Sequence, residues 1–373
     1  MRKCDVILTY TWNRVSYNIL KSLAAKGLKV VVGDTSKYTI CSLSNMSYSS
    51  FVYPDPFTRE EEFIRTLTER INEWQPAMLI PTHDEGIIIA KHRDKFPERL
   101  IIGVDRYDKI IALSDKEVAT GYAGKLGIPI PRIYGDISEI KEFPVVFKTR
   151  IGNSAKGVFF PKNRSELSDL SNSYKASEVM VQEYIPGTDH SVDCIRTGDF
   201  FFASVYKAVL TKTNGGGTTT QRVIVDRPEL VGYSKTLLDY VDYQGVCGLD
   251  FKYDEQTGKC AFIEVNARYT GGLATPVCAG FDIPYIHYCL SLYGKYENPV
   301  DLKIGTKTKW ILGDIITFVE RVLNFKLSRQ ELRSLCNFRF DGFDDYSAGD
   351  RRAILGECLY YFMKLIQNRK LNP

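Results

Sequence analysis

The segment FIEVNAR places three polar side chains at alternate positions of an expected strand. Glu264, Asn266 and Arg268 share one face, because successive side chains of a strand point to opposite sides. Val265 and Ala267 point the other way, into the expected core. The strand is therefore predicted to be half buried, with its polar face lining a cavity or meeting solvent.

A partner strand, GLDFKY, carries a further acid. The intervening DEQTGK contains a Thr-Gly turn suited to a hairpin, and a loop over residues 255–259 places Asp250 directly opposite Glu264. Like charges facing each other across a sheet destabilise it, so a cation between them is a natural compensation. Magnesium is commonly held by one or two carboxylates plus substrate phosphates. We therefore predict a Mg²⁺ or Mn²⁺ site at Asp250, Glu264 and Asn266.

The alternative for this hairpin is a solvent-exposed polar face without a metal. Lys252 shares the face of Asp250, and together with Arg268 it could neutralise the two acids. Motifs elsewhere in the chain are needed to distinguish a metal site from an exposed polar face.

A glycine-containing loop follows an apolar strand in PVVFKTRIGNSAKGV. Lys148 ends the strand, and Gly152 and Gly157 flank Asn153, Ser154 and Lys156. Glycine allows close backbone approach, so such a loop can offer N–H groups and ammonium charge to phosphates. A hairpin turn with solvent-facing lysines is the alternative for this loop taken alone.

In combination these motifs resemble the ATP-grasp superfamily. Its order is a lysine before the nucleotide domain, a lysine with a glycine-rich loop, an acidic hinge, and a carboxylate preceding a Glu-x-Asn pair. This sequence presents that order from about Ser114 to Gly280, with Lys116 in SDK, then GNSAKG, QEYIPGTDHSVD, Asp250 and the Glu264 strand. The N-terminal segment is similar to the pre-grasp domain of carbamoyl phosphate synthetase and biotin carboxylase.

The resemblance implies a set of roles around ATP and magnesium. Lys116 and Lys148 would hold α and β phosphate oxygens, and the GNSAKG loop would close over the β and γ phosphates. Arg268 would meet the transferred phosphoryl group, with Lys207 and Arg222 as further candidates. The adenine and ribose contacts would come from the hinge residues Glu183, Tyr184, Ile185 and Asp189.

Three residues depart from the common pattern. Thr149 stands where a proline often follows the loop lysine, and Asp250 and Asp189 stand where many members carry Glu. A shorter acid still reaches a cation, so the departures affect the expected geometry and not the assignment. TKTNGGGTTTQR is expected to form a flap over the acceptor or a hairpin tip, and His83, Asp84 and Glu85 are substrate candidates.

The elements that must position these residues indicate an α/β and α+β architecture. Short apolar strands alternate with helices up to about Pro81, which predicts a parallel sheet, and the resemblance implies that residues 1–112 form a Rossmann-like pre-grasp domain. The segment after a helix beginning at Ser114 is rich in strands that are expected to be mostly antiparallel, and the resemblance implies an ATP-grasp domain over 113–302. Residues 303–373 are expected to be a helical extension that caps the acceptor site or mediates dimerisation.

The composition is that of an ordinary globular protein. The 373 residues carry 49 Lys and Arg against 45 Asp and Glu, so the net charge of +4 gives no reason to expect a nucleic-acid partner. The 9 cysteines are scattered without a CxxC pair, and no apolar stretch reaches the length of a spanning helix. We expect a cytoplasmic protein with small-molecule partners and no membrane partner, and a homodimer is one option for its assembly.

The function implied is a ligase that activates a carboxylate as an acyl phosphate and joins it to an amine. ADP and phosphate would be released, and neither the carboxylate nor the amine is identified by the sequence. The alternatives are carboxyphosphate or carbamoyl phosphate chemistry, and an ATP-binding module without catalysis.

Overall fold

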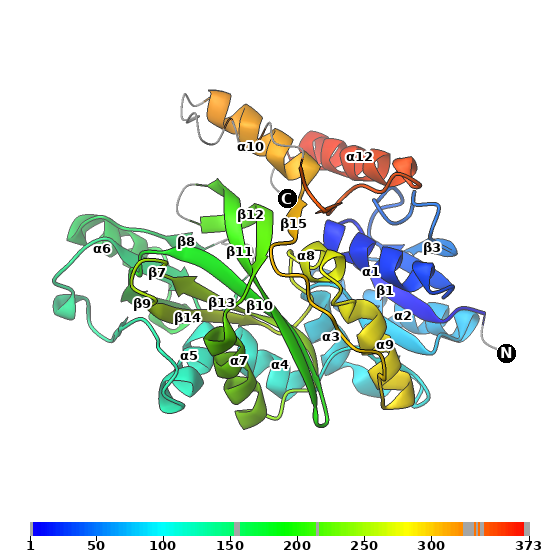
Figure 1. Ribbon diagram of the computed structural model, residues 1–373, viewed down its shortest axis with the longest axis horizontal. Helices are drawn as coiled ribbons and strands as arrows, with labels where there is room; N and C mark the ends of the chain where they lie inside the picture. Colours follow the sequence, from blue (N-terminus) through cyan, green and yellow to red (C-terminus); the bar gives the residue numbers. More distant parts are fainter. Residues whose placement is uncertain are drawn as a thin grey trace.

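The computed structural model describes residues 3–152, 157–213, 216–323, 332, 335 and 339–368. Three sheets organise this part of the chain (Figure 1). The N-terminal sheet lies on the right of the figure, a small sheet lies on the left, and a large sheet runs between them. The mixture of one parallel sheet with antiparallel sheets and helices is the predicted fold class.

The N-terminal sheet is parallel and is covered by helices on both faces. Val6 and Leu8 pack with residues of α1 (Arg14–Ala25), whereas Ile7 packs with residues of α2 (Glu60–Trp74). This split follows from the alternation of side chains along a buried strand. The strand order is β3 (Ser49–Val52), β2 (Val30–Asp34), β1 (Val6–Thr9), β4 (Met78–Pro81) and β5 (Ile101–Ile102).

The carboxyl ends of these strands lead into the loops that meet the rest of the molecule. Tyr10 follows β1 with a φ of 57°, a left-handed conformation that is uncommon for a non-glycine residue. His83 and Asp84 follow β4 and precede α3 (Glu85–Lys91). In open α/β sheets this edge is where ligands bind.

The small sheet is antiparallel and carries the lysine of the glycine-containing loop. Its core pairs Val145 and Phe147 with Leu167 of α6 (Arg164–Asn172). The strand order is β6 (Ile133–Tyr134), β9 (Val179–Glu183), β7 (Val145–Thr149) and β8 (Val158–Phe159).

The large sheet has seven strands and is antiparallel except for its last pair. Buried residues of the sheet form one hydrophobic core with residues of three helices, α4 (Tyr107–Ser114), α5 (Lys116–Lys125) and α7 (Pro228–Tyr240). The strand order is β14 (Cys260–Asn266), β13 (Gly245–Tyr253), β10 (Thr188–Thr197), β11 (Phe200–Thr213), β12 (Gly216–Val225), β15 (Lys307–Lys309) and β16 (Gly342–Phe343).

The predicted helix from Ser114 is present, with a different cap. α5 begins at Lys116, and the Asp115 carboxylate accepts hydrogen bonds from the backbone N–H groups of Glu117 at 3.0 Å and Val118 at 3.3 Å. Asp115 is therefore the N-cap, because Ser114 is still the last residue of α4.

The C-terminal region contains helices, as expected, and also completes the large sheet. β15 pairs with β12, and β16 pairs with β15. α10 (Ile311–Leu323) and α12 (Arg351–Asn368) lie along the upper rim in Figure 1. The short connecting helices are α8 (Ala274–Cys278), α9 (Ile283–Tyr293), η1 (Arg93–Lys95), η2 (Ile137–Glu139) and η3 (Ala176–Glu178).

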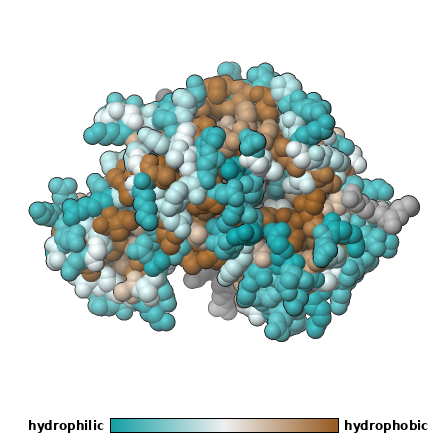
Figure 2. All heavy atoms as spheres, turned by 90° about the horizontal axis from the view of Figure 1, so that it is seen from below, coloured by the Kyte–Doolittle hydropathy of each residue, from teal (hydrophilic) through white to brown (hydrophobic). Residues whose placement is uncertain are grey.

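Figure 2 shows the molecule from below, after a 90° turn about the horizontal axis of Figure 1. Hydrophilic residues cover most of its two ends, and apolar residues gather towards the middle of this face. No helix in the described ranges is long and apolar enough to cross a membrane.

Candidate functional site

The β13–β14 hairpin brings together the three predicted metal ligands. Asp250 pairs directly with Glu264, as predicted, and the Asn266 amide nitrogen donates to Asp250 Oδ2 at 3.0 Å. The loop begins at Asp254, one residue earlier than predicted, and an irregularity after Asp250 restores the register. The register therefore survives because a bulge absorbs the extra loop residue.

Asp250 lies in surroundings that disfavour its charge. Burial, with the neighbouring Glu264 carboxylate as the second cause, raises the pKa of Asp250 to about 7. The Ser191 hydroxyl on β10 donates a hydrogen bond to Asp250 and opposes this rise. A cation bound between the two acids would remove the repulsion that the hairpin register imposes.

Both predicted phosphate-binding lysines reach this hairpin. Lys116 opens α5, and its Nζ lies 3.4 Å from Glu264 Oε2 and 2.8 Å from the Gly152 carbonyl oxygen, to which it donates. Lys148 on β7 donates to the Ile263 carbonyl oxygen at 3.2 Å. Burial lowers the pKa of Lys148 to about 8, with the Lys116 charge acting in the same direction and Glu264 against it.

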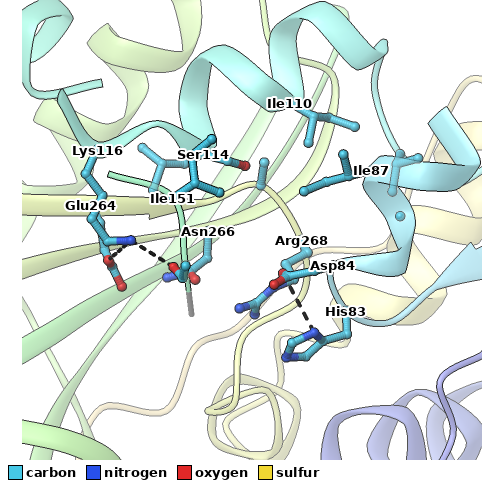
Figure 3. Close-up of a pocket in the computed structure, with 15 residues that line it drawn as sticks. His83, Asp84, Ile87, Ile110, Ser114, Lys116, Ile151, Glu264, Asn266 and Arg268 are labelled. Atoms are coloured by element: carbon cyan, nitrogen blue, oxygen red, sulfur yellow. Dashed lines mark hydrogen bonds and ion pairs between the residues drawn. The ribbon is translucent and has the colours of Figure 1, made fainter. Parts of the chain in front are cut away.

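The pocket beside the hairpin has two polar ends (Figure 3). Lys116, Glu264 and Asn266 lie at one end, and Arg268, Asp84 and His83 lie at the other. Apolar side chains from the N-terminal region and α4 close the space between them. The described residues that line the pocket are His83, Asp84, Gly86, Ile87, Val104, Ile110, Ser114, Lys116, Ile151, Gly152, Glu264, Val265, Asn266, Ala267 and Arg268.

An ion pair across the pocket joins the N-terminal unit to the hairpin. Arg268 Nε donates to Asp84 Oδ1 at 2.7 Å, and a second guanidinium nitrogen donates to the Tyr269 carbonyl oxygen at 3.2 Å. His83 Nδ1 lies 3.7 Å from the same Asp84 oxygen, and its ring stacks on Tyr10 at 5.1 Å between centroids. Two of the three N-terminal substrate candidates therefore line the pocket.

Glu85, the third N-terminal candidate, is fully buried. Its Oε1 accepts hydrogen bonds from the Thr9 hydroxyl at 2.7 Å and the Thr82 backbone N–H at 2.9 Å. Burial raises the pKa of Glu85 to about 7. These contacts join β1 to the loop after β4, so Glu85 supports the sheet edge and does not line the pocket in the described structure.

The glycine-containing loop is described only at its two ends. Gly152 contributes to the pocket, and a side chain at Gly157, which has a φ of 79°, would collide with Thr149. Asn153, Ser154 and Lys156 lie outside the described residues.

The predicted adenine hinge follows the small sheet. Glu183 ends β9, and its carboxylate accepts from the Arg132 backbone N–H at 3.2 Å. The Tyr184 ring meets Phe160 edge-on at 6.0 Å. Ile185 belongs to the connection into β10, and Asp189 at the start of β10 pairs with Lys252 at 2.6 Å.

Lys207 and Arg222 are placed away from the Arg268 end of the pocket. Lys207 Nζ pairs with Glu255 Oε1 at 3.0 Å, and Arg222 forms a buried ion pair with Asp344 at 2.8 Å. Asp344 also pairs with Arg14 at 3.0 Å. The tip of the predicted flap at residues 214–215 lies outside the described part of the chain.

Sequence reasoning missed the Asp344 network and the Arg268–Asp84 pair. Both join residues that are far apart in the chain, and neither has a local spacing signal. The position of Asp84 at the carboxyl end of a parallel strand was the one available clue.

The hairpin donors fit a hard divalent cation. Asp250 and Glu264 supply carboxylate oxygens, and Asn266 supplies an amide oxygen if its amide group turns over. In the described residues no group of three or more His, Cys, Asp and Glu forms a metal cage. Magnesium that is held by one or two carboxylates usually completes its coordination with oxygens of substrate phosphates.

A family model and one curated relative each match part of the chain. A family model described as "ATP-grasp in the biosynthetic pathway with Ter operon" matches residues 175–313. A D-alanine–D-alanine ligase of Fusobacterium nucleatum is 31% identical over 78 residues, which are 21% of this chain and 26% of that protein. The chain therefore matches only about a quarter of that relative's length.

Solved structures share the architecture at low identity. The ADP complex of an N5-carboxyaminoimidazole ribonucleotide synthetase is 15% identical, with a TM-score of 0.67 over 87% of this chain and 86% of that one. The biotin carboxylase domain of Hydrogenobacter thermophilus 2-oxoglutarate carboxylase, with MgADP, ADP and bicarbonate, is 14% identical, with a TM-score of 0.66 over 82% and 74%. An L-amino acid ligase of Bacillus licheniformis is 14% identical, with a TM-score of 0.62 over 81% and 78%.

Proposed function

We propose that the chain is an ATP-grasp enzyme that uses ATP and Mg²⁺ to activate a carboxylate as an acyl phosphate and to join it to an amine. The observation that carries this proposal is the pairing of Asp250 with Glu264 beside Lys116 and Arg268. Phosphoryl transfer depends mainly on positioning and charge neutralisation, and these residues supply both.

The geometry of the two lysines supports a nucleotide site at this end of the pocket. Lys116 and Lys148 converge on the strand of Glu264, where they would hold phosphate oxygens of ATP. Asp250, Glu264 and Asn266 would hold Mg²⁺, which would neutralise charge on the transferred phosphoryl group. Glu183, Tyr184, Ile185 and Asp189 would contact adenine and ribose, with Gly152, Asn153, Ser154, Lys156 and Gly157 near the phosphates.

The other end of the pocket carries one cationic and one anionic side chain. A carboxylate substrate is an anion, and an amine substrate arrives mainly as a cation. We assign Arg268 to the carboxylate and the phosphoryl group it receives, and Asp84 to the ammonium group. Without substrates Arg268 and Asp84 pair with each other. The carboxylate substrate would replace Asp84 as the partner of Arg268, and the amine would replace Arg268 as the partner of Asp84.

The reaction would proceed in two steps between these ends. A carboxylate oxygen attacks the γ phosphorus of ATP, the bond to the bridging oxygen breaks, and ADP leaves. The amine, after losing a proton to Asp84 or to solvent, attacks the acyl carbon, and phosphate leaves with the electron pair of its bond. An amide, ADP and phosphate are the products.

The proposal retains the three-part division of the chain at residues 112 and 302. The five-stranded sheet lies within the first part and the four-stranded sheet within the second. β15 and β16 extend the sheet of the second part, so the third part supports it structurally.

Trapping with hydroxylamine tests the activation step. Purified protein with MgATP and a panel of carboxylates, including amino acids and bicarbonate, should release ADP and phosphate and give a hydroxamate with the true substrate. Glu264→Gln should lower this rate by at least about a hundredfold, since it removes one of two charged ligands. Glu62→Gln, in an exposed pair with Arg59, is the matched control and should keep full activity.

The products separate the alternatives. Bicarbonate as the stimulating acid would indicate carboxyphosphate chemistry. AMP and pyrophosphate would contradict the acyl phosphate mechanism. ATP binding without any stimulated release across the panel would favour a binding module.

A further inference from the structure

Helix α10 buries its polar side and exposes its apolar side. Its buried residues are Gly313, Asp314, Thr317 and Arg321. This is the reverse of the usual surface helix, in which the apolar stripe faces the core. The exposed apolar residues are Ile315, Phe318, Val319, Val322 and Leu323, with exposed fractions from 38% to 73%.

Specific polar contacts fix α10 in this orientation. Asp314 accepts a hydrogen bond from the Gln221 amide at 2.6 Å and pairs with Lys309 at 3.0 Å. Arg321 donates to the Thr211 carbonyl oxygen at 2.7 Å. Turning the helix over would break these contacts, so the apolar stripe remains outward.

α12 continues the exposed apolar surface. Leu355, Phe362 and Ile366 are 53%, 60% and 64% exposed, and their spacing of seven and four residues places them on one side of the helix. The Glu357 carboxylate on the buried side accepts from the Trp310 indole N–H at 3.1 Å, just before α10. The two helices are thereby joined, and both lie on the upper rim in Figure 1.

The exposed apolar residues of α10 and α12 are gathered and not scattered. Eight large apolar side chains are exposed on the outward sides of two helices that lie next to each other in Figure 1. Single exposed apolar residues need no partner, whereas apolar side chains gathered on neighbouring helices mark an interaction site.

The charge of the C-terminal region indicates which partner fits. Residues 303–373 contain 13 Lys and Arg against 8 Asp and Glu, a net charge of +5, so the rest of the chain carries −1. Five of these eight acids are buried, namely Asp314, Asp344, Asp345, Asp350 and Glu357. Among the described residues of this region, the exposed cations are Lys303, Lys307, Arg339, Arg351 and Arg352, against the exposed acids Glu320 and Asp341.

We propose that the exposed faces of α10 and α12 bind the surface of a lipid bilayer that contains anionic lipid. Apolar side chains would enter the boundary of the acyl chains, and the basic residues would meet the headgroups. In a dimer formed through this surface, two regions that each carry a net charge of +5 would face and repel each other. The inference is independent of the proposed ligase activity and describes a peripheral contact.

Sedimentation with vesicles tests the surface. The full chain should sediment with phosphatidylcholine vesicles containing about one third phosphatidylglycerol, and much less with phosphatidylcholine alone. Raising the salt concentration should weaken binding, because the electrostatic part is screened. Phe318→Ser with Val322→Ser should reduce the bound fraction at least about fivefold, and Arg351→Glu with Arg352→Glu should reduce it on anionic vesicles.

Two controls keep the result interpretable. Tyr293→Ser removes an apolar side chain that is 63% exposed on α9, away from the patch, and should leave vesicle binding unchanged. Thermal unfolding checks that each variant is folded. The proposal is overturned if the unaltered chain sediments with neither kind of vesicle. If the unaltered chain is a dimer and Phe318→Ser with Val322→Ser converts it to a monomer, the surface binds a second copy instead.

Discussion

Asp84 is the residue whose assignment is most open to direct test. It lies 2.7 Å from Arg268, at the end of the pocket away from Lys116. If it binds the acceptor's ammonium group, its charge should matter for cationic amines and not for an uncharged nucleophile. Hydroxylamine is such a nucleophile, because it is mostly neutral at pH 7.

We therefore expect Asp84→Asn to separate the two kinds of acceptor. The KM for the best amine of the panel should rise about tenfold or more, whereas hydroxamate formation should keep its rate, since a charge-assisted contact is worth about 1.5 to 3 kcal/mol. Asp108→Asn, in an exposed pair with Arg106, is the control. Equal losses with amine and hydroxylamine would show that Asp84 only supports Arg268.

The buried carboxyl group of Asp193 is expected to make the stability of the protein depend on pH. It is 2% exposed on β10, and its Oδ1 accepts from the Thr270 hydroxyl at 2.6 Å. Burial raises the pKa of Asp193 to about 7, although Thr270 and the charge of Arg222 oppose the rise. Between pH 4 and 7 the folded state retains a proton that the unfolded state releases, so stability falls as the pH rises through this window.

Asp193→Asn should remove this contribution. The variant keeps an acceptor for Thr270 and carries no charge, so we expect a gain of about 1 to 3 kcal/mol at pH 8 and little change at pH 4. Urea unfolding at the two pH values measures the difference. A gain of the same size at both pH values would contradict the assignment, and Asp108→Asn should leave the difference as in the unaltered protein.

At the scale of elements, Asp344 holds α1, β12 and the segment after β16 together. It is fully buried and pairs with both Arg14 and Arg222. The Arg14 guanidinium also lies 4.0 Å over the Trp310 ring. The network therefore joins the N-terminal sheet, the large sheet and the start of α10.

Asp344→Asn should be strongly destabilising. It leaves two buried guanidinium groups without a full counter-charge, and breaking a buried pair in this way costs about 3 to 5 kcal/mol. The midpoint of urea unfolding measures the loss. A loss no larger than that of the exposed variant Asp108→Asn would show that the network contributes little.

The sequence predicted the elements with a clear period and missed those without one. The alternation in FIEVNAR and GLDFKY predicted both the face and the Asp250–Glu264 register. β15 and β16 are three and two residues long and carry no pattern, so a helical extension was the natural expectation. The part of the site that depends on packing between units, the Arg268–Asp84 pair, was beyond local spacing.

Candidate residues chosen by order in the chain also separated in space. Lys207 and Arg222 are candidates beside Arg268 because they lie on the strands that flank the expected flap. Strand neighbours in the large sheet place Arg222 opposite Thr308 of β15, where its partner is Asp344. Lys116 and Lys148 therefore reach the Glu264 strand as chain order suggested, whereas Lys207 and Arg222 do not line the pocket.

At the scale of the whole molecule, the pocket lies between residues of the N-terminal unit and the hairpin. His83, Asp84 and Val104 come from one side, and Glu264 and Arg268 come from the other. A ligand that bridges the two sides should stabilise the assembled chain by mass action.

MgADP should accordingly raise the unfolding temperature. Saturation at about one hundred times the Kd corresponds to about 2.7 kcal/mol. Removing the metal with EDTA should abolish most of the rise, because Asp250 and Glu264 would then face the phosphates without a cation. An equal rise in unfolding temperature with ADP in EDTA would show that the site does not use magnesium. Differential scanning fluorimetry measures the unfolding temperature under both conditions.

The long sequence separation in the Asp344 network has a consequence for how the chain is made. Arg14 and Arg222 leave the ribosome 330 and 122 residues before Asp344. At about 5 to 20 residues per second, Arg222 waits about 6 to 24 s for its counter-ion. The edge of β12 also stays unpaired until β15 is synthesised. The large sheet can therefore reach its final packing only after Asp344 has been synthesised, and a nascent chain halted before residue 344 should depend on chaperones.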